Sequence, residues 1–253
     1  MKQLNRSWRI FATGFSFFTF GLGGLFLGFI LFPFVLIFVR DYKKRKTTMR
    51  SIVSFSFRSF MYLMHFLGVI KFSKKNTRHL YEDSSCLLIA NHPTLIDVVS
   101  IIAYCPNACC IVKEDLWQNK FVNKVLKSVG YIPNIDPNDL LEKCKKAVAS
   151  GDVLIIFPEG TRTTPGAQVK FQRGASHIAL MLKCPVRCVE LSCDPITLTK
   201  GLPWYDVPST RANFSMTVKD KFLPYDYISS ETPRPKAARE LTRIFLKQYC
   251  RTV

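Results

Sequence analysis

One histidine and one aspartate, five residues apart, have the types and spacing of a proton-transfer pair. His92 and Asp97 lie in the segment NHPTLID, directly after an apolar run typical of a buried strand. A neutral imidazole is well suited to take a proton from an alcohol near pH 7. A carboxylate at the other ring nitrogen fixes the tautomer and stabilises the imidazolium that forms. The pair therefore predicts activation of a hydroxyl group, with His92 as the base and Asp97 as its partner.

A second polar segment, FPEGTR, follows another apolar run and predicts a phosphate contact. A glycine such as Gly160 lets the backbone approach a ligand, and the Arg162 guanidinium offers a fork that matches a phosphate. Ligands of open α/β sheets bind beyond the carboxyl ends of the strands. Although Glu159 lies 67 residues after His92, the two segments are therefore expected to converge on one site.

Each of these segments also has a purely structural interpretation. Thr94 and Asp97 have the spacing of a capping box at a helix start, a role that is compatible with catalysis. The sequence Pro-Glu-Gly can form a simple turn, and Arg162 can be a solvated surface residue.

The chain contains no suitable G-x-S-x-G nucleophile elbow. Direct attack by the activated alcohol is therefore favoured over an acyl-enzyme.

The elements that must position these residues begin near residue 85, where short apolar runs alternate with amphipathic stretches. Such alternation predicts an α/β fold with a mostly parallel central sheet flanked by helices. Asp136 and Pro137 have the types of a helix N-cap and first helical residue. The expected strands are 86–90, 108–112, 131–135, 153–157, 186–191 and 214–218, and the expected helices are 95–104, 116–129, 140–150, 175–182 and 235–249.

The N-terminal part of the chain predicts a membrane anchor. Residues 10–39 contain no charged side chain, and as one helix they would extend about 45 Å against a hydrocarbon core of about 30 Å. This run is too long for the apolar part of a signal peptide. It fits either a tilted single span or a re-entrant hairpin bent at its glycines, and basic residues at both ends favour the hairpin.

A second apolar stretch, residues 52–70, is interrupted by Arg58 and His65. This pattern predicts a helix lying on the bilayer surface, and the alternative is a helix packed on the soluble domain. The expected domains are N-terminal anchoring helices over residues 1–80 and a catalytic α/β domain over residues 81–253.

The distribution of charge points to lipid headgroups rather than to nucleic acid. The net charge is +18. Residues 1–80 hold 14 Lys or Arg and one acid, a balance of +13, whereas residues 81–253 hold 22 and 17, a balance of +5. No nucleic-acid motif accompanies the basic residues, which flank apolar runs. The nine cysteines lack zinc-ligand spacing and predict a reduced, cytosol-facing domain without a metal.

Taken in order, the polar segments resemble the glycerolipid acyltransferase superfamily, which includes the lysophosphatidic acid acyltransferases. The resemblance covers residues 85–195. NHPTLID is similar to the first family block, N-H-x-x-x-x-D, and FPEGTR to the third. GYIPNID is similar to the second block, VKEDL to a lysine segment between the first two, and CPVR to the fourth.

This resemblance implies a role for each candidate residue. They are catalytic His92 and Asp97, phosphate-contacting Lys113 and Arg162, and acceptor-binding Glu159, Gly160 and Thr161. Family members take an acyl group from acyl-CoA or acyl-carrier protein and place it on a lysolipid at the membrane surface. The chain is thus expected to be a membrane-bound O-acyltransferase on the cytoplasmic face, with membrane lipids as partners. It needs no cofactor, because the thioester is already activated.

Two departures from the family pattern bear on the acceptor. The second block usually ends with an arginine, but here Pro137 follows Asp136, and Asp115 replaces the usual glutamate of the lysine segment. Lysophosphatidate remains the default acceptor, with another lysophospholipid or lyso-ornithine lipid as the alternative. Two other functions stay open. One is a non-enzymatic protein that binds anionic lipid, and the other is a hydrolase that uses water as the acceptor.

Overall fold

The computed structural model describes residues 2–135, 137–166 and 169–249. A long N-terminal helical segment comes first, and an alternation of strands and helices follows it. The elements are α1 (Lys2–Phe26), η1 (Leu27–Leu31), α2 (Phe32–Phe38), α3 (Tyr42–Phe66), β1 (Ile70–Lys75), α4 (Arg78–Glu82), β2 (Cys86–Ala90), α5 (Asp97–Ile102), β3 (Ala108–Lys113), α6 (Glu114–Gln118), α7 (Lys120–Ser128), β4 (Ile132–Asn134), α8 (Pro137–Ala149), β5 (Val153–Ile156), α9 (Gly174–Leu182), β6 (Val186–Asp194), β7 (Ala212–Phe222), η2 (Pro224–Asp226) and α10 (Arg234–Tyr249).

Seven strands form one mixed sheet in the order β1-β7-β6-β2-β5-β3-β4. Five of them, from β6 to β4, run parallel, whereas β7 is antiparallel to β6 and parallel to β1. The mostly parallel α/β sheet predicted from the alternating runs is therefore confirmed. The β1 strand begins at Ile70, so the sheet starts eleven residues before residue 81, the expected start of the catalytic domain.

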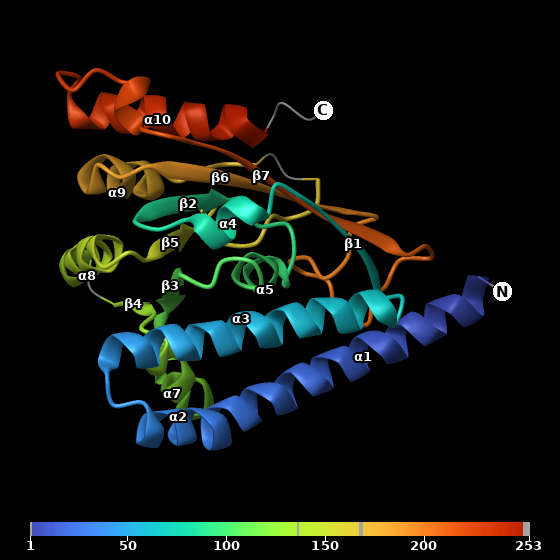
Figure 1. The fold of residues 1–253 in the computed structure, drawn as a ribbon. Coiled ribbons are helices and arrows are strands. Elements are labelled where there is room, and N and C mark those ends of the chain that lie inside the picture. Colours follow the sequence, from blue (N-terminus) through green and yellow to red (C-terminus); the bar gives the residue numbers. More distant parts are fainter. Residues whose placement is uncertain (1, 136, 167–168, 250–253) are drawn as a thin grey trace.

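The central strand β2 is buried on both faces, and its side chains alternate between two hydrophobic cores. Leu88 points into the core that α3 and α5 cover, and Leu87 points into the core that α8, α9 and α10 cover. Figure 1 shows α8 and α9 on one side of the strands and α5 on the other. Burial on both faces explains why β2 is apolar throughout, as expected for a central strand of a parallel sheet.

The N-terminal helices form a hairpin that packs beneath the sheet domain (Figure 1). From Gln3 to Phe38 the chain is one helix that is long and apolar enough to cross a membrane by length and composition. The hairpin expected to bend at the glycines within residues 10–39 is therefore not formed, and the chain turns instead between α2 and α3. The helix α3 runs back beside it, and Phe20 packs against Phe57 and Phe60 of α3. Met49, Met61 and Met64 of α3 are buried in the core that this helix shares with the sheet domain. For residues 52–70 the structure therefore shows the alternative considered above, a helix packed on the soluble domain.

Two basic residues of α3, the buried Arg50 and the partly buried Lys46, tie the hairpin to the sheet domain. The Arg50 guanidinium donates to both carboxylate oxygens of Asp152, at 2.7 and 3.0 Å, and to the carbonyl oxygen of Val129 at 2.7 Å. Lys46 Nζ lies 2.7 Å from the same carboxylate. Because Asp152 directly precedes β5, this cluster joins α3 to the strand that leads into FPEGTR.

Candidate active site

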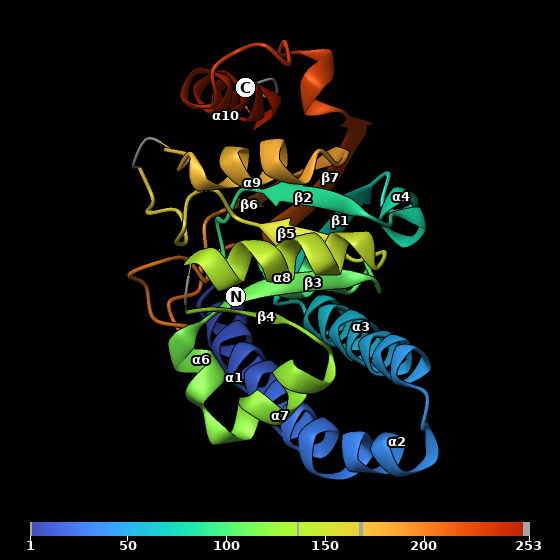
Figure 2. The ribbon, with the colours of Figure 1, turned by 90° about the vertical axis from the view of Figure 1, so that its left-hand side faces the viewer.

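The site lies at the edge of the sheet where the parallel strands end. The carboxyl ends of β2, β5, β3 and β6 meet there because these strands point the same way. In Figure 2 the segments that follow β5 and β6 lie together with α6 on the left-hand side. The NHPTLID and FPEGTR segments, which follow adjacent strands β2 and β5, are thus neighbours, as the sequence predicted.

His92 and Asp97 are in direct contact. The Nδ1 atom of His92 lies 2.8 Å from Oδ2 of Asp97, whose side chain is fully buried, while the His92 side chain is 17% exposed. An ionised carboxylate can only accept, so the proton of the ring is on Nδ1. This tautomer leaves a lone pair on Nε2 for the proton of an alcohol.

The Asp97 carboxylate is fixed by more than the imidazole. The backbone N–H of Thr94 donates to Oδ2 at 2.6 Å, and the Thr94 hydroxyl donates to Oδ1 at 2.5 Å. Asp97 is also the first residue of α5. The contact expected between Thr94 and Asp97 is therefore present, but it closes the turn before α5 and does not cap the helix, whose N-cap is Ile96.

Burial raises the pKa of the Asp97 carboxyl above its ordinary value, although the hydrogen bonds from His92 and Thr94 act in the opposite direction. Desolvation disfavours the charged form of an acid, and hydrogen bonds to the carboxylate favour it. A buried carboxylate held against a histidine at the end of a strand is an arrangement that concentrates at functional sites.

Glu159 joins the two segments by their backbones. Its Oε1 accepts from the backbone N–H of His92 at 2.8 Å, and its Oε2 accepts from the hydroxyl of Thr163 at 2.6 Å. The backbone N–H of Thr163 in turn donates to the carbonyl oxygen of His92 at 2.8 Å. Both carboxylate oxygens are thus engaged in holding the histidine segment. Glu159 lies where the resemblance expects it, but its contacts position His92.

Arg162 lies beside this junction and is half-buried. Its Nη1 is 3.3 Å from the carbonyl oxygen of Thr199 and 3.5 Å from that of Leu198, in the segment after β6. Within the described residues its Nη2 and Nε make no hydrogen bond, so these N–H groups can take a further acceptor. The structure therefore brings Arg162 to the histidine segment, as expected.

The other candidates lie at the same edge with looser connections. Gly160 has φ +70°, a left-handed conformation that suits glycine, and closes a turn with its N–H on the Phe157 carbonyl at 3.0 Å. Thr161 is exposed next to it, and Lys113 is exposed at the end of β3. No hydrogen bond joins Thr161 or Lys113 to His92 or Asp97 in the described part of the chain. The expected N-cap Asp136 lies outside the described residues.

Two residues that contact the His92 segment, Phe157 and Thr163, were not predicted. Phe157 stacks on the imidazole with ring centroids 4.3 Å apart and planes 29° apart, which restricts the rotation of the ring. Thr163 supplies the two hydrogen bonds described above. The available signal for Phe157 was its position. It is the last residue of an expected strand whose end was expected to lie beside the NHPTLID segment. Thr163 carried no signal of its own.

Comparison with known proteins gives consistent results. The family model described as Acyltransferase matches residues 70–192. A 1-acyl-sn-glycerol-3-phosphate acyltransferase of Helicobacter pylori (strain J99) is 28% identical over 67% of this chain and 72% of its own length. Proteins with the same name from Bacillus subtilis and Cocos nucifera are 31% and 34% identical over 47% and 42% of this chain. The matches span only 60% and 37% of those two proteins.

The match to one solved structure extends over the full length of both chains. The crystal structure of the 1-acyl-sn-glycerophosphate (LPA) acyltransferase PlsC from Thermotoga maritima superposes with a TM-score of 0.66 at 20% identity. At that identity the similarity establishes the fold alone. The sheet and the N-terminal helices described above therefore have a counterpart in a solved structure.

Proposed function

We propose that this chain, which matches the Acyltransferase family model over residues 70–192 and is similar to 1-acyl-sn-glycerol-3-phosphate acyltransferases, is an O-acyltransferase that acylates the free hydroxyl of 1-acyl-glycerol-3-phosphate, with His92 as the general base and a fatty acyl thioester as the donor. The contact between His92 Nδ1 and the buried Asp97 carboxylate is the single observation that carries the mechanism. The names of the relatives carry the acceptor, since each of the three is a 1-acyl-sn-glycerol-3-phosphate acyltransferase.

The proton moves through His92. Nε2 takes the proton of the acceptor hydroxyl as its oxygen attacks the thioester carbonyl, and the resulting imidazolium is stabilised by the Asp97 carboxylate. The new C–O bond forms, the C–S bond breaks, and the leaving thiolate takes the proton back from Nε2. The products are the diacylated lipid and a free thiol. No metal is required, because the thioester carbonyl is already activated.

The remaining residues orient the acceptor. Arg162 would bind the phosphate through its Nη2 and Nε groups, and Lys113 would add a second positive charge from the end of β3. Gly160 and Thr161 would line the approach to the phosphate. Glu159 would act indirectly, by fixing the backbone on which His92 is carried. The donor would be acyl-CoA or acyl-carrier protein.

The N-terminal hairpin would hold the enzyme on one leaflet of the membrane, at its cytoplasmic face. A spanning orientation of α1 and α2 would carry α3 into the hydrocarbon layer, since α3 lies beside them. That helix contains the buried Arg50 and the partly buried Lys46, which are paired with Asp152 of the sheet domain. Placing these groups in lipid would be costly. The packing of α3 therefore supports an arrangement in which α1, α2 and α3 lie in the plane of the membrane over a single span by α1 and α2.

The test is acyl transfer by His92→Ala in purified membranes, with labelled acyl-CoA and a panel of lysolipids. We expect transfer to fall by about 10³-fold or more, since the general base is removed, while membrane association is retained. The control is His177→Ala, which removes an exposed histidine of α9.

Each other outcome has a defined meaning. Retained transfer in His92→Ala would contradict the mechanism. Product formation only from lyso-ornithine lipid or another lysophospholipid would contradict the acceptor. Release of free fatty acid without any lysolipid would identify a hydrolase. Vesicle binding without thioester consumption in the wild-type protein would identify a lipid-binding protein.

A further inference from the structure

Residues 195–211, between β6 and β7, connect the candidate site to the N-terminal helix. We call them the β6–β7 segment. They contain no helix or strand. Long segments without secondary structure are uncommon in compact domains and usually have a function. The two ends of this segment contact different parts of the molecule.

The beginning of the β6–β7 segment contacts the candidate site. The Leu198 carbonyl accepts from the backbone N–H of Leu95 at 2.8 Å, and the Thr199 carbonyl accepts from Arg162 Nη1 at 3.3 Å. The Thr199 hydroxyl donates to the carbonyl oxygen of Thr163 at 3.1 Å. Leu198 and Thr199 are buried. The position of Arg162 therefore depends on the backbone of this segment.

The end of the β6–β7 segment is held by α1. Arg9 Nη2 donates to the carbonyl oxygens of Pro208 and Ser209 at 2.9 and 2.6 Å. Arg6, one turn earlier, donates from Nε to the Val207 carbonyl at 3.1 Å. The ring of Trp204, in the middle of the segment, lies so close to Gly14 that a Cβ there would be 3.1 Å from it. Side chains of α1 thus hold the segment along its second half.

Arg9 is unusual among these contacts because its charge is buried without an anion. Arg9 is only 8% exposed. Within the described residues it forms no ion pair, and its Nε has no hydrogen-bond partner. Burying an unpaired charge reduces stability. A contribution to folding is therefore a poor explanation for a guanidinium at this position.

We propose that Arg9 is a positioning residue for the acceptor, which acts through the β6–β7 segment on Arg162. By fixing Pro208 and Ser209, it holds the backbone that bears the Leu198 and Thr199 carbonyls. Arg162 is then oriented with Nη2 and Nε free for a phosphomonoester headgroup. This inference rests on the proposed function, and it concerns binding of the acceptor rather than the proton transfer.

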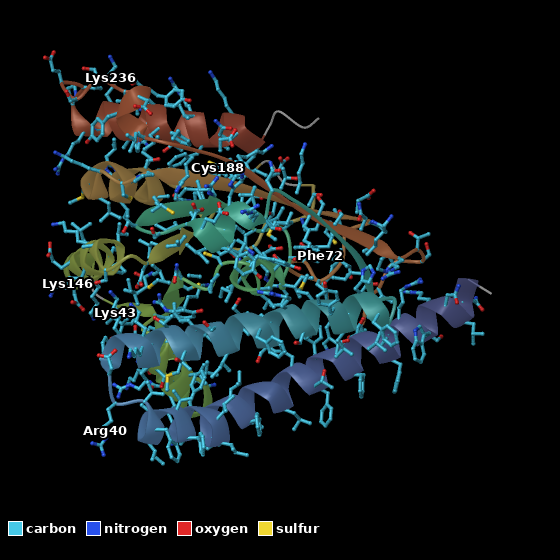
Figure 3. All side chains as sticks on the ribbon, in the orientation of Figure 1. Arg40, Lys43, Phe72, Lys146, Cys188 and Lys236 are labelled. Atoms are coloured by element: carbon cyan, nitrogen blue, oxygen red, sulfur yellow. The ribbon has the colours of Figure 1, made fainter. Side chains whose placement is uncertain are left out.

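The test compares steady-state constants of full-length Arg9→Gln and wild type on vesicles that contain lysophosphatidate. Loss of two charge-assisted hydrogen bonds is expected to raise the KM for the acceptor about tenfold. The kcat and the KM for the donor should change less than about twofold. Arg9→Lys should restore part of the acceptor KM, since an ammonium still reaches a carbonyl. The control, Arg40→Gln, removes an exposed charge from the end of the same helical segment without touching the β6–β7 segment (Figure 3).

A double-mutant cycle separates positioning from a general structural effect. If Arg9 acts through Arg162, then Arg9→Gln should raise the acceptor KM less than about twofold in an Arg162→Gln background. Additive effects would overturn the inference, and so would an equal rise in the donor KM. If Arg9→Gln does not fold, Gly14→Ala provides a milder disturbance of the β6–β7 segment, because the added methyl group displaces only the Trp204 ring. An unchanged acceptor KM in Gly14→Ala would also overturn the inference. An unchanged KM in Arg9→Gln alongside an inactive His92→Ala would refute this inference and leave the proposed function intact.

Discussion

Asp97 is a charged group with no access to water, held between a histidine and a threonine. Its oxygens accept from His92 Nδ1 and from the backbone and hydroxyl of Thr94. Even with these bonds, burial raises the pKa of the Asp97 carboxyl. The charged form is therefore less stable in the folded protein than in water, which suits a residue kept for chemistry rather than for stability.

The first prediction concerns Asp97→Asn. The amide keeps an oxygen for Thr94, but it can no longer fix the tautomer of His92 or stabilise an imidazolium. Transfer is expected to fall by about 10³- to 10⁴-fold, the scale found when a catalytic triad loses its carboxylate. Stability at neutral pH should be equal to or above that of the wild type. Chemical denaturation and an acyl-transfer assay check the two parts, and a large loss of stability would contradict this account.

The raised pKa of the Asp97 carboxyl also determines the direction in which the stability of the protein changes with pH. The folded state binds the Asp97 proton more tightly than the unfolded state, so the contribution is largest below the ordinary pKa of 3.8 and is lost as pH rises through the raised value. The free energy of unfolding of the wild type relative to Asp97→Asn should therefore decrease as pH rises above 3.8. Denaturant titrations of both proteins from acid to neutral pH measure this, and a relative increase with pH would contradict it.

The sequence predicted the pairing of His92 with Asp97 better than it predicted the contacts that hold this pair in place. His92 and Asp97 were recognisable because their contact is local and depends on a spacing of five residues. The contact of Glu159 with the His92 backbone was not predictable, since it depends on how β2 and β5 lie side by side. The stacking of Phe157 on His92 has the same origin. Long-range register decides these contacts, and no residue type encodes it.

At the scale of elements, the cluster of Arg50, Lys46 and Asp152 joins the α3 helix to the sheet. The side chains of Arg50 and Asp152 are 5% and 7% exposed. Desolvation favours the neutral form of Arg50, but the hydrogen bonds and charge of Asp152 outweigh it and raise the pKa of Arg50. Removing one member of such a pair leaves an uncompensated buried charge.

The second prediction is that Asp152→Asn destabilises the protein by about 3 kcal/mol or more, in the range measured for broken buried ion pairs. Equilibrium denaturation in detergent or on vesicles provides the measurement. The matched control is Asp139→Asn on α8, which breaks an exposed pair with Lys143 and should change stability by less than about 1 kcal/mol. Equal effects of the two substitutions would show that burial of the pair is not what matters.

Most strands and helices were predictable from periodicity, and two exceptions have clear causes. The strand β1, IKFSKK, has few apolar residues because it lies at the edge of the sheet, so it resembled a loop in sequence. The helix α3 was predicted as a surface helix because Phe55 and Phe66 are apolar, and these residues are indeed exposed. Its buried side, however, includes Arg50 and Ser54, whose polar groups conceal the packing in a sequence pattern.

At the scale of the whole molecule, the outer face of α1 and η1 carries a continuous apolar stripe. Its members are strongly exposed and recur at helical spacing, which is typical of a surface that contacts lipid or another apolar partner. They are Trp8, Phe11, Phe15, Phe18, Leu22, Leu25, Phe26, Phe29 and Ile30. Basic residues flank this stripe, among them Arg40 and Lys43 at the far end of the hairpin (Figure 3).

The third prediction is that Phe11→Glu combined with Phe18→Glu weakens binding to anionic vesicles by about tenfold or more. The double substitution removes two aromatic side chains that would insert into the bilayer, and it adds negative charge that anionic lipid repels. Both residues are exposed, so stability should change little. Sedimentation with vesicles measures binding. His177→Glu adds a negative charge on α9, away from the stripe, and should leave binding nearly unchanged. Equal loss in this control would attribute the effect to charge alone.

The fixed attachment of the β6–β7 segment to α1 has a consequence for kinetics. Since Arg9 and Arg6 couple the site to the same helix that bears the apolar stripe, the site would stay at a constant height above the leaflet during turnover. Encounter with substrate then becomes diffusion in two dimensions. The velocity should follow the mole fraction of lysolipid in the surface, and diluting the vesicles with inert phospholipid should slow the enzyme even when the bulk substrate concentration is constant.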